Sequence, residues 1–344
     1  MRLLLCLFFY TTMKKPSLSF PVDAVFTWVD GNDPVWLHNR ANALRNYGSS
    51  DQPAAEALSP ARFQDNDEMR YALRSLALYV PWLRRVHVIT AGQKPEWINT
   101  ETVTIVDHKD ILPSQDLLPV FSSRPIELCA HRIPGLAEHF ICFNDDFMIG
   151  RSLDPTDFFR ADGTPLVWAV RRGRKTMRKL LTSPTHISLH KSAVARSHQL
   201  IQKKYGRTFP IVMRHFPKSM TVSTANAVWE TFPQEVQQTL SSRFRADTDI
   251  WIHMLYPLYL LATGQGILRP INGLRQVYDF FFQGVAHIGA SLPDSNFCQK
   301  MNRIKRFAPL TFCLNDAPGS SEADRKKLKD FLHDLFPAPG LFEK

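Results

Sequence analysis

A short polar triplet between two apolar runs constrains this chain more than any other feature. The triplet Asn144-Asp145-Asp146 follows apolar residues 141–143 and precedes apolar residues 147–149. Adjacent carboxylates at a strand end repel each other unless a cation lies nearby, and hard cations such as Mg²⁺ take carboxylate oxygens together with substrate phosphate oxygens. A polar turn with solvated acids would explain the same residues. The triplet therefore indicates either a metal and phosphate site or a simple turn.

Strand and helix patterns alternate from residue 22 to residue 146. Runs rich in β-branched and aromatic residues predict strands, and apolar residues at helical spacing predict helices. The expected order is a strand at 22–29, a helix opening at Asp65 with Glu68 completing a capping box, strands at 85–90 and 101–106, a helix at 122–133 and a strand at 140–143. This alternation predicts an α/β fold with a mostly parallel sheet. Ligands bind at the carboxyl ends of such strands, so Asp30 and the Asn144 triplet should share one edge.

The second half of the chain reads as mainly helical and contains two basic segments. Residues 171–179 (RRGRKTMRK) hold six basic residues and predict a mobile, solvated loop, with steering of an anionic substrate or contact with an anionic membrane as alternatives. His215 is flanked by Arg214 and Lys218, which would push its pKa towards the neutral form that a base needs. A lone loop histidine is more often a surface residue. We also expect a helix at 249–262 with Asp247 as its N-cap, a strand at 307–314 ending in Asn315-Asp316, and a helix from Ser321.

Composition limits the partners of the chain. The 344 residues carry a formal net charge of +10, which favours an anionic partner such as a nucleotide, an acidic glycan, nucleic acid or an anionic lipid surface. The five cysteines form no CxxC pair, which argues against a disulfide framework and a cysteine zinc site. Cys129 and Cys142 lie in apolar segments and are expected in the core. A reducing, cytoplasmic setting fits these features.

The first residues form a short apolar run, residues 3–10, which is too short to span a bilayer. No small-residue cleavage site precedes Lys14-Lys15. We therefore expect neither export nor a transmembrane helix. Either Met1 or Met13 is the start, and peripheral attachment to the inner face of the cell membrane stays open.

Four ordered sequence blocks resemble the Stealth family of hexose-1-phosphate transferases, which includes bacterial capsule polymerases and the catalytic subunit of N-acetylglucosamine-1-phosphotransferase. The blocks are VFTWVDGNDP at 25–34, DNDEMRYALRSLALYVPWLRRVHVIT at 65–90 continuing through FSSRPIE and HRIPGL to FNDDFMIG, HFPKSM at 215–220 with SRFRADTD at 242–249, and FCLND at 312–316. Residues 171–179 match none of them.

The resemblance implies a Rossmann-like (GT-A-like), mostly parallel sheet with a helical C-terminal portion that completes the site. The expected divisions are an extension at 1–20, a nucleotide-sugar-binding core at 21–165, a mainly helical catalytic and acceptor portion at 166–320, and a C-terminal helix at 321–344. The implied reaction is the transfer of hexose-1-phosphate, for example N-acetylglucosamine-1-phosphate, from a UDP-sugar to a glycan hydroxyl, with UMP released, in capsule or other surface polysaccharide synthesis.

Site residues follow from the resemblance and the strand ends. His215 is the expected base, and Asp30, Arg243 and Arg245 are further catalytic candidates. Trp28, Asn32, Arg70, Arg74 and Asn144 are expected to bind the donor. Mg²⁺ or Mn²⁺ is expected on Asp145, Asp146 and Asp316.

Two other functions would fit part of the same pattern. A metal-dependent GT-A glycosyltransferase would cleave the sugar C1–O bond and release UDP. A non-catalytic module that binds polyanions is compatible with the charge. However, the basic residues are not interleaved with aromatic ones as a single-strand nucleic-acid binder requires, so no nucleic-acid partner is expected. The hexose, the acceptor and the oligomeric state are not determined by the sequence.

Overall fold

A five-stranded sheet forms the centre of the computed structural model, which describes residues 18–47, 52–182, 188–271, 287–292, 296–315 and 319–344. The strand order is β3-β2-β1-β4-β8, and only β8 runs antiparallel to its neighbour. The bounds are β1 Val22–Thr27, β2 Val86–Thr90, β3 Val103–Asp107, β4 His139–Asn144 and β8 Lys218–Thr221. The prediction of an α/β fold with a mostly parallel sheet is confirmed.

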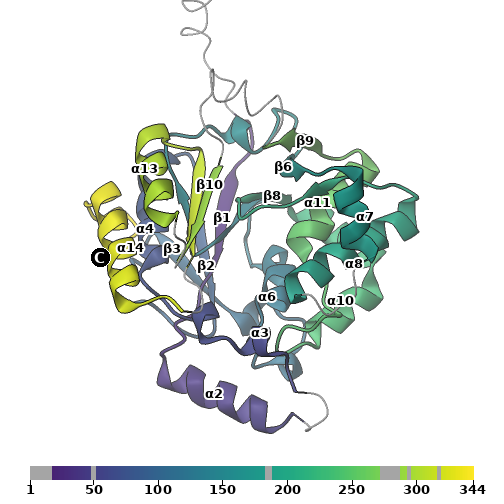
Figure 1. Cartoon of the computed structure of the whole chain (residues 1–344), viewed down its shortest axis with the longest axis horizontal. Helices are drawn as coiled ribbons and strands as arrows, with labels where there is room; N and C mark the ends of the chain where they lie inside the picture. Colours follow the sequence, from purple (N-terminus) through teal and green to yellow (C-terminus); the bar gives the residue numbers. More distant parts are fainter. Residues whose placement is uncertain (1–17, 48–51, 183–187, 272–286, 293–295, 316–318) are drawn as a thin grey trace, which may run out of the picture.

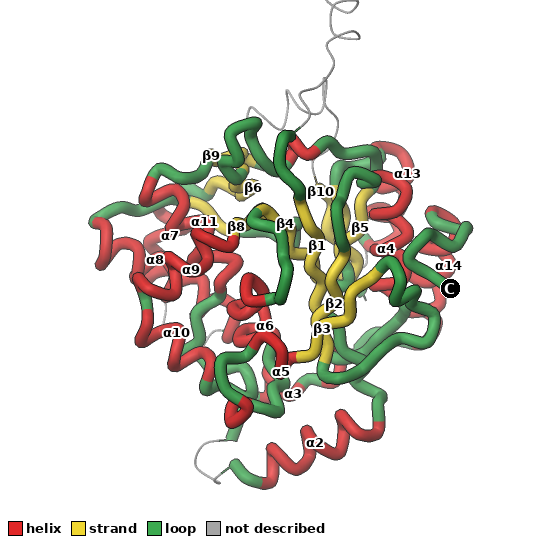
Figure 2. The backbone as a smooth tube through the Cα atoms, turned by 180° about the vertical axis from the view of Figure 1, so that it is seen from behind, coloured by secondary structure: helices red, strands yellow, loops and turns green. Residues whose placement is uncertain are grey.

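Strands β1 and β4 are buried on both faces, which explains their nearly continuous apolar sequences. Phe26 on β1 stacks on Phe143 on β4, with ring centroids 4.8 Å apart, in the core beneath α4 (Glu68–Tyr79). Phe140 and Cys142 face the opposite core, which α6 (Ser123–Cys129) and α11 (Ile252–Thr263) cover. The central strands therefore lie between two helical layers, as Figures 1 and 2 show.

The remaining elements extend these layers. Two three-stranded sheets flank the centre, in the orders β10-β11-β5 and β7-β6-β9. Their bounds are β5 Phe147–Ile149, β6 Leu166–Arg171, β7 Ile211–Val212, β9 Ile267–Pro270, β10 His287–Ser291 and β11 Thr311–Asn315. The other α-helices are α2 Pro34–Arg45, α3 Ala55–Leu58, α5 His108–Ile111, α7 Arg174–Thr182, α8 Leu189–Tyr205, α9 Val222–Thr231, α10 Pro233–Leu240, α13 Phe297–Phe307 and α14 Glu322–Leu335. The short 3-10 helices are Pro60–Arg62, Gln115–Leu117, Ala130–Arg132 and Pro155–Asp157.

Three local predictions were wrong. Helix α4 begins at Glu68 rather than Asp65, because the Asp65 side chain accepts the Asp67 amide and so closes a turn before the helix. Asp247 does not cap α11, whose N-cap is Trp251. Most of the expected loop at 171–179 is helix α7, because Met177 is buried on one side of an otherwise exposed, basic helix.

Cys129 and Cys142 are buried in the core, as predicted. Helix α2 has Asp33 as its N-cap, and the Asp33 side chain accepts the Trp36 amide at 2.7 Å. Helix α9 ends at Thr231, and α10 begins at Pro233.

Among the residues that the structure describes, no helix is both long and apolar enough to cross a bilayer.

Candidate active site

A cavity of about 150 Å³ opens at the carboxyl ends of β1 and β4. The parallel pairing aligns Thr27 with Asn144, and the chain continues from each into the cavity wall. Helix α6 and the loop before it form the opposite wall. The lining includes Thr27, Trp28, Asn144, Asp145, Arg62, Ser122, Ser123, Glu127 and Arg245. The end of the first strand and the Asn144 triplet therefore lie together, as predicted.

Three carboxyl groups gather beside this cavity. Burial and the Asp146 charge raise the pKa of Asp145 well above its usual range. Burial, together with the charge of Glu68, raises the pKa of Asp146 to about 7, and burial raises the pKa of Glu68 to about 7. Oδ1 of Asp146 is buried and has no hydrogen-bond partner among the described residues. Such crowding favours a bound cation, because a cation would offset the repulsion between the carboxylates.

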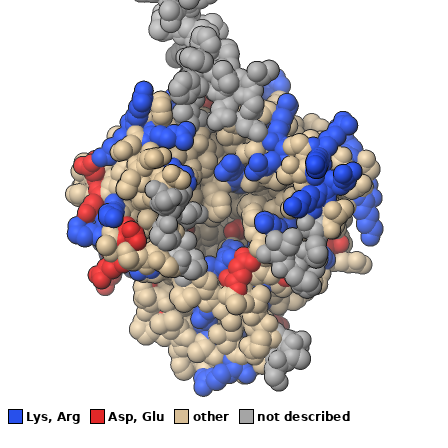
Figure 3. All heavy atoms as spheres, in the orientation of Figure 1, with Lys and Arg blue, Asp and Glu red and all other residues tan. Residues whose placement is uncertain are grey.

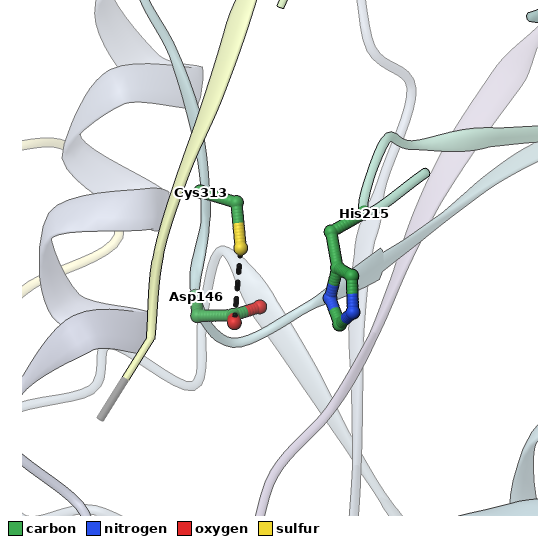
Figure 4. A group of neighbouring side chains, drawn as sticks. All are labelled: Asp146, His215 and Cys313. Carbon is green, nitrogen blue, oxygen red and sulfur yellow. Dashed lines mark hydrogen bonds between the residues drawn. The ribbon is translucent and has the colours of Figure 1, made fainter. Parts of the chain in front are cut away.

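His215 lies next to the triplet although it is far away in sequence. It belongs to the loop between β7 and β8, and β8 pairs with β4. The donor atoms of His215, Asp146 and Cys313 all lie within 4.8 Å of one another, and the side chains point towards each other (Figure 4). His215 is exposed, yet desolvation by the surrounding protein and the Lys218 charge lower its pKa to about 4. His215 is therefore neutral at ordinary pH, as a base requires.

Glu127 and Arg124 are functional candidates to which the sequence reasoning assigned no role. Burial would raise the pKa of Glu127, but the charges of His253 and Arg124 hold it below its usual range. Trp251 Nε1 donates to Glu127 at 3.1 Å. Burial and the Arg245 charge lower the pKa of Arg124 to about 10, and its Nη1 has no partner among the described residues. Both residues belong to the FSSRPIE block, where charged residues within an apolar helix could have been recognised as site candidates.

Lys218 was also missed as a site residue. Burial lowers the pKa of its ammonium group to about 7. This group donates to the carbonyl oxygens of Arg214, at 3.0 Å, and of Phe216. These two carbonyls flank His215 in the chain. Lys218 therefore holds the turn that presents His215.

Several of the other residues expected at the site lie at the cavity or in the hollow beside it. Arg245 lines the cavity and donates to Ser123 Oγ at 2.8 Å. Trp28 lines the cavity and a neighbouring hollow, which Asp30 also lines. Asn32 is exposed. Its backbone amide donates a hydrogen bond to Asp30 Oδ1 at 2.8 Å.

Three predicted arginines are engaged elsewhere. Arg70 and Arg74 pair with Glu343, each through Nε at 2.6 Å, and neither lines the cavity. Arg243 donates to the carbonyls of Leu118, at 2.6 Å, and Asp116, at 3.1 Å. The structure therefore does not bring these side chains to the expected diphosphate. The remaining predicted metal ligand, Asp316, lies outside the described residues.

Comparisons of the sequence with known proteins identify its family. Models of Stealth protein conserved regions 1, 2 and 3 match residues 20–48, 62–167 and 214–262. A capsular polysaccharide phosphotransferase of Haemophilus influenzae is 30% identical over 312 residues, which cover 88% of this chain and 79% of the relative. The chain belongs to the Stealth family. The three conserved regions supply Asp30, Asp145 and His215 respectively, so the Stealth regions converge on the cavity and its surroundings.

Other Stealth relatives are longer than this chain. An exopolysaccharide phosphotransferase of Streptomyces coelicolor is 34% identical over 333 residues, which cover 95% of this chain and 58% of the relative. The chain spans only 53% and 52% of two further exopolysaccharide phosphotransferases from the same organism. Among solved structures, the galactosyltransferase LgtC, in complex with donor and acceptor sugar analogs, is 10% identical with a TM-score of 0.43, covering 92% of this chain and 97% of LgtC.

Proposed function

We propose that this Stealth protein transfers hexose-1-phosphate from a UDP-sugar to a hydroxyl of a surface glycan and releases UMP. The main observation in support is that a neutral histidine, His215, lies within 4.8 Å of the crowded carboxyl group of Asp146. A base beside an acidic cation site suits phosphoryl transfer, which depends on positioning and charge neutralisation. The names of the relatives, capsular and exopolysaccharide phosphotransferases, support the same reaction class.

Mg²⁺, or Mn²⁺ in its place, fits the residues present. Asp145 and Asp146 would hold the ion, because hard cations prefer carboxylate oxygens and Oδ1 of Asp146 is buried without a partner among the described residues. When bound, the ion would neutralise charge on the diphosphate.

The side chains of this chain would carry out the remaining steps. His215 takes the proton from the acceptor hydroxyl as its oxygen bonds to the β-phosphorus. The bond between that phosphorus and the bridging oxygen breaks, and UMP leaves with the electron pair. Arg245 lines the cavity, and Arg124, whose Nη1 has no partner among the described residues, belongs to helix α6, which forms one wall; both would supply fixed positive charge. The hollow lined by Trp28 and Asp30 would take the nucleoside.

The released nucleotide tests the proposed reaction. The chain is incubated with UDP-sugars, Mg²⁺ and glycan acceptors, and the nucleotide is identified by chromatography. UMP is the expected product, whereas UDP would identify a glycosyltransferase and no turnover across donors and acceptors would favour a polyanion-binding module. EDTA should stop the reaction and added Mg²⁺ should restore it. Activity without a metal would contradict the role of Asp145 and Asp146.

We also propose that helix α7 contacts an anionic membrane surface. Arg174, Lys175 and Arg178 are exposed, and no described carboxylate pairs with them. Basic side chains gather on the side of the molecule where α7 lies (Figure 3). Basic residues near a membrane contribute about 1 kcal/mol each. The chain should therefore co-sediment with phosphatidylserine vesicles at low salt but not with phosphatidylcholine vesicles, and neutralising the three residues should abolish the difference.

A further inference from the structure

Three side chains of different chemistry meet at one point beside the proposed active site. Strand β11 pairs antiparallel with β5 so that Cys313 lies opposite Phe147, the residue that follows Asp146. As a result, Cys313 Sγ lies 3.2 Å from Asp146 Oδ2. The loop before β8 brings His215 to the same point, and the three donor atoms lie within 4.8 Å of one another. One carboxylate, one imidazole and one thiol therefore surround a common position (Figure 4).

This donor set differs from one suited to Mg²⁺. Mg²⁺ takes oxygen ligands in a strict octahedral arrangement. A carboxylate, an imidazole and a thiolate together suit Zn²⁺ and similar borderline-soft cations, which accept three protein ligands and a water in a tetrahedron. Bonds of about 2.0–2.3 Å in a tetrahedron place ligand atoms roughly 3.3–3.8 Å apart. The separations here exceed that range by no more than about 1 Å, so small side-chain rotations would close the site.

Among the described residues, one carboxylate oxygen of Asp146 lacks a hydrogen-bond partner, whose place a bound cation could take. Oδ1 of Asp146 is buried and has no hydrogen-bond partner among the described residues, and burying a polar atom without a partner is costly. The buried ammonium group of Lys218 interacts electrostatically with Asp146 and Cys313, and its positive charge would disfavour a cation. A carboxylate and a thiolate together balance the two charges of the metal, so the occupied site is itself neutral.

We propose that Asp146, His215 and Cys313 bind Zn²⁺ or a cation of the same class. Binding replaces the thiol proton of Cys313, which passes to solvent, by a sulfur–metal bond. The imidazole and the carboxylate bind through lone pairs and need lose no further proton when His215 is neutral and Asp146 ionised. The bound state excludes the proposed transfer reaction, since it engages His215 and competes with Mg²⁺ for Asp146. That consequence, unlike the binding itself, rests on the proposed function.

Cobalt binding tests the site without any measurement of activity. Co²⁺ replaces Zn²⁺ in tetrahedral sites and gives a thiolate-to-cobalt charge-transfer absorption when sulfur is bound. We expect this absorption to saturate at one equivalent in the presence of excess Mg²⁺, and Zn²⁺ to remove it. Cys313→Ser should abolish the absorption, whereas Cys298→Ser, which changes an exposed cysteine on α13, should retain it. Absence of the absorption in the unaltered chain, or its persistence in Cys313→Ser, would overturn the proposal.

Calorimetric titration with Zn²⁺ tests the contribution of each of the three ligands to the binding affinity. Cys313→Ser, His215→Ala and Asp146→Asn should each weaken Zn²⁺ binding at least tenfold, with circular dichroism confirming that each variant is folded. Unchanged affinity in folded variants would contradict the ligand set. If the chain transfers hexose-1-phosphate, Zn²⁺ should inhibit at saturating Mg²⁺, and Cys313→Ser should be less sensitive relative to its own uninhibited rate. A chain that binds Co²⁺ as described but transfers nothing would refute the proposed function and leave the metal site standing.

Discussion

Arg74 and Glu343 form a two-point ion pair, with Nε to Oε1 at 2.6 Å and Nη2 to Oε2 at 2.9 Å. The Arg74 side chain is 7% exposed and that of Glu343 is 2% exposed. The carboxylate also accepts from Arg70 Nε at 2.6 Å. One acid near the C-terminal end of the chain thus fixes two arginines of α4, which explains why neither reaches the cavity.

Replacing Glu343 by Ala should destabilise the protein. The change leaves the buried Arg74 charge without a carboxylate, and breaking a buried pair in this way costs about 3–5 kcal/mol. Urea denaturation measures the loss. Glu101→Ala, at an exposed position, should change the free energy of unfolding by less than about 0.5 kcal/mol. If Glu343→Ala had normal stability but bound the donor more weakly, Arg70 and Arg74 would have to take part in donor binding.

The same pair predicts a pH dependence of stability. Burial would raise the pKa of Glu343, but hydrogen bonds from Arg74 and Arg70 lower it to about 2. A lowered pKa contributes stability that is complete above the ordinary value of 4.5 and is lost as pH falls towards 2. The stability difference between the unaltered chain and Glu343→Gln should therefore be largest at neutral pH and shrink below about pH 4.5. A difference that stays constant down to pH 3 would contradict the ion pair.

Arg245 and Arg243 should behave differently although they are two residues apart. Arg245 lines the cavity, so Arg245→Ala should lower kcat/KM by about 100-fold, the size expected for one preorganised charged donor. Arg243 binds loop carbonyls instead, so Arg243→Ala should lower stability by about 1–3 kcal/mol. Steady-state kinetics and thermal unfolding of both variants test the contrast. Equal kinetic losses with unchanged stability would show that both arginines serve the reaction.

His215→Ala should abolish turnover and leave donor binding intact. Loss of a general base costs about 10²–10⁴-fold in rate, whereas His215 does not line the cavity proposed to take the donor. Turnover assays and calorimetry with a UDP-sugar separate the two effects. His333→Ala, on the exposed face of α14, is the matched control. Full activity in His215→Ala would remove this residue from the mechanism.

Lys218→Met should lower kcat more than it raises the KM of the donor. The ammonium group holds the two carbonyls that flank His215, and displacement of a base by about 1 Å can cost about 100-fold. Loss of the nearby positive charge should also raise the pKa of His215 from about 4. The acid limb of the pH–rate profile should then move to higher pH. Lys203→Met, at an exposed position, should change neither quantity. An unshifted acid limb would exclude the electrostatic effect, and an unchanged kcat would exclude the positioning role.

Local sequence patterns predicted the four parallel strands of the central sheet, several helices and the acidic strand end. The β-branched and aromatic runs of β1 and β4, and the apolar stripe of α4, are properties of neighbouring residues, so periodicity alone reveals them. Asn144 and Asp145 were predictable at the cavity for the same reason, because residues that follow parallel strands meet at one sheet edge. The basic neighbours of His215 marked it as one candidate base, and the Stealth blocks made it the expected one and added Arg245.

Only the tertiary structure decided which charged side chains reach the cavity. A short arginine spacing on α4 indicates a shared face but not the acid that faces it, and that acid, Glu343, is 269 residues from Arg74. In the same way, Cys313 reaches Asp146 only because β11 pairs with β5. Long-range strand pairing and ion pairing depend on the packing of distant segments, which local sequence does not encode. The sequence therefore located the acidic edge, and the fold selected its basic, histidine and thiol neighbours.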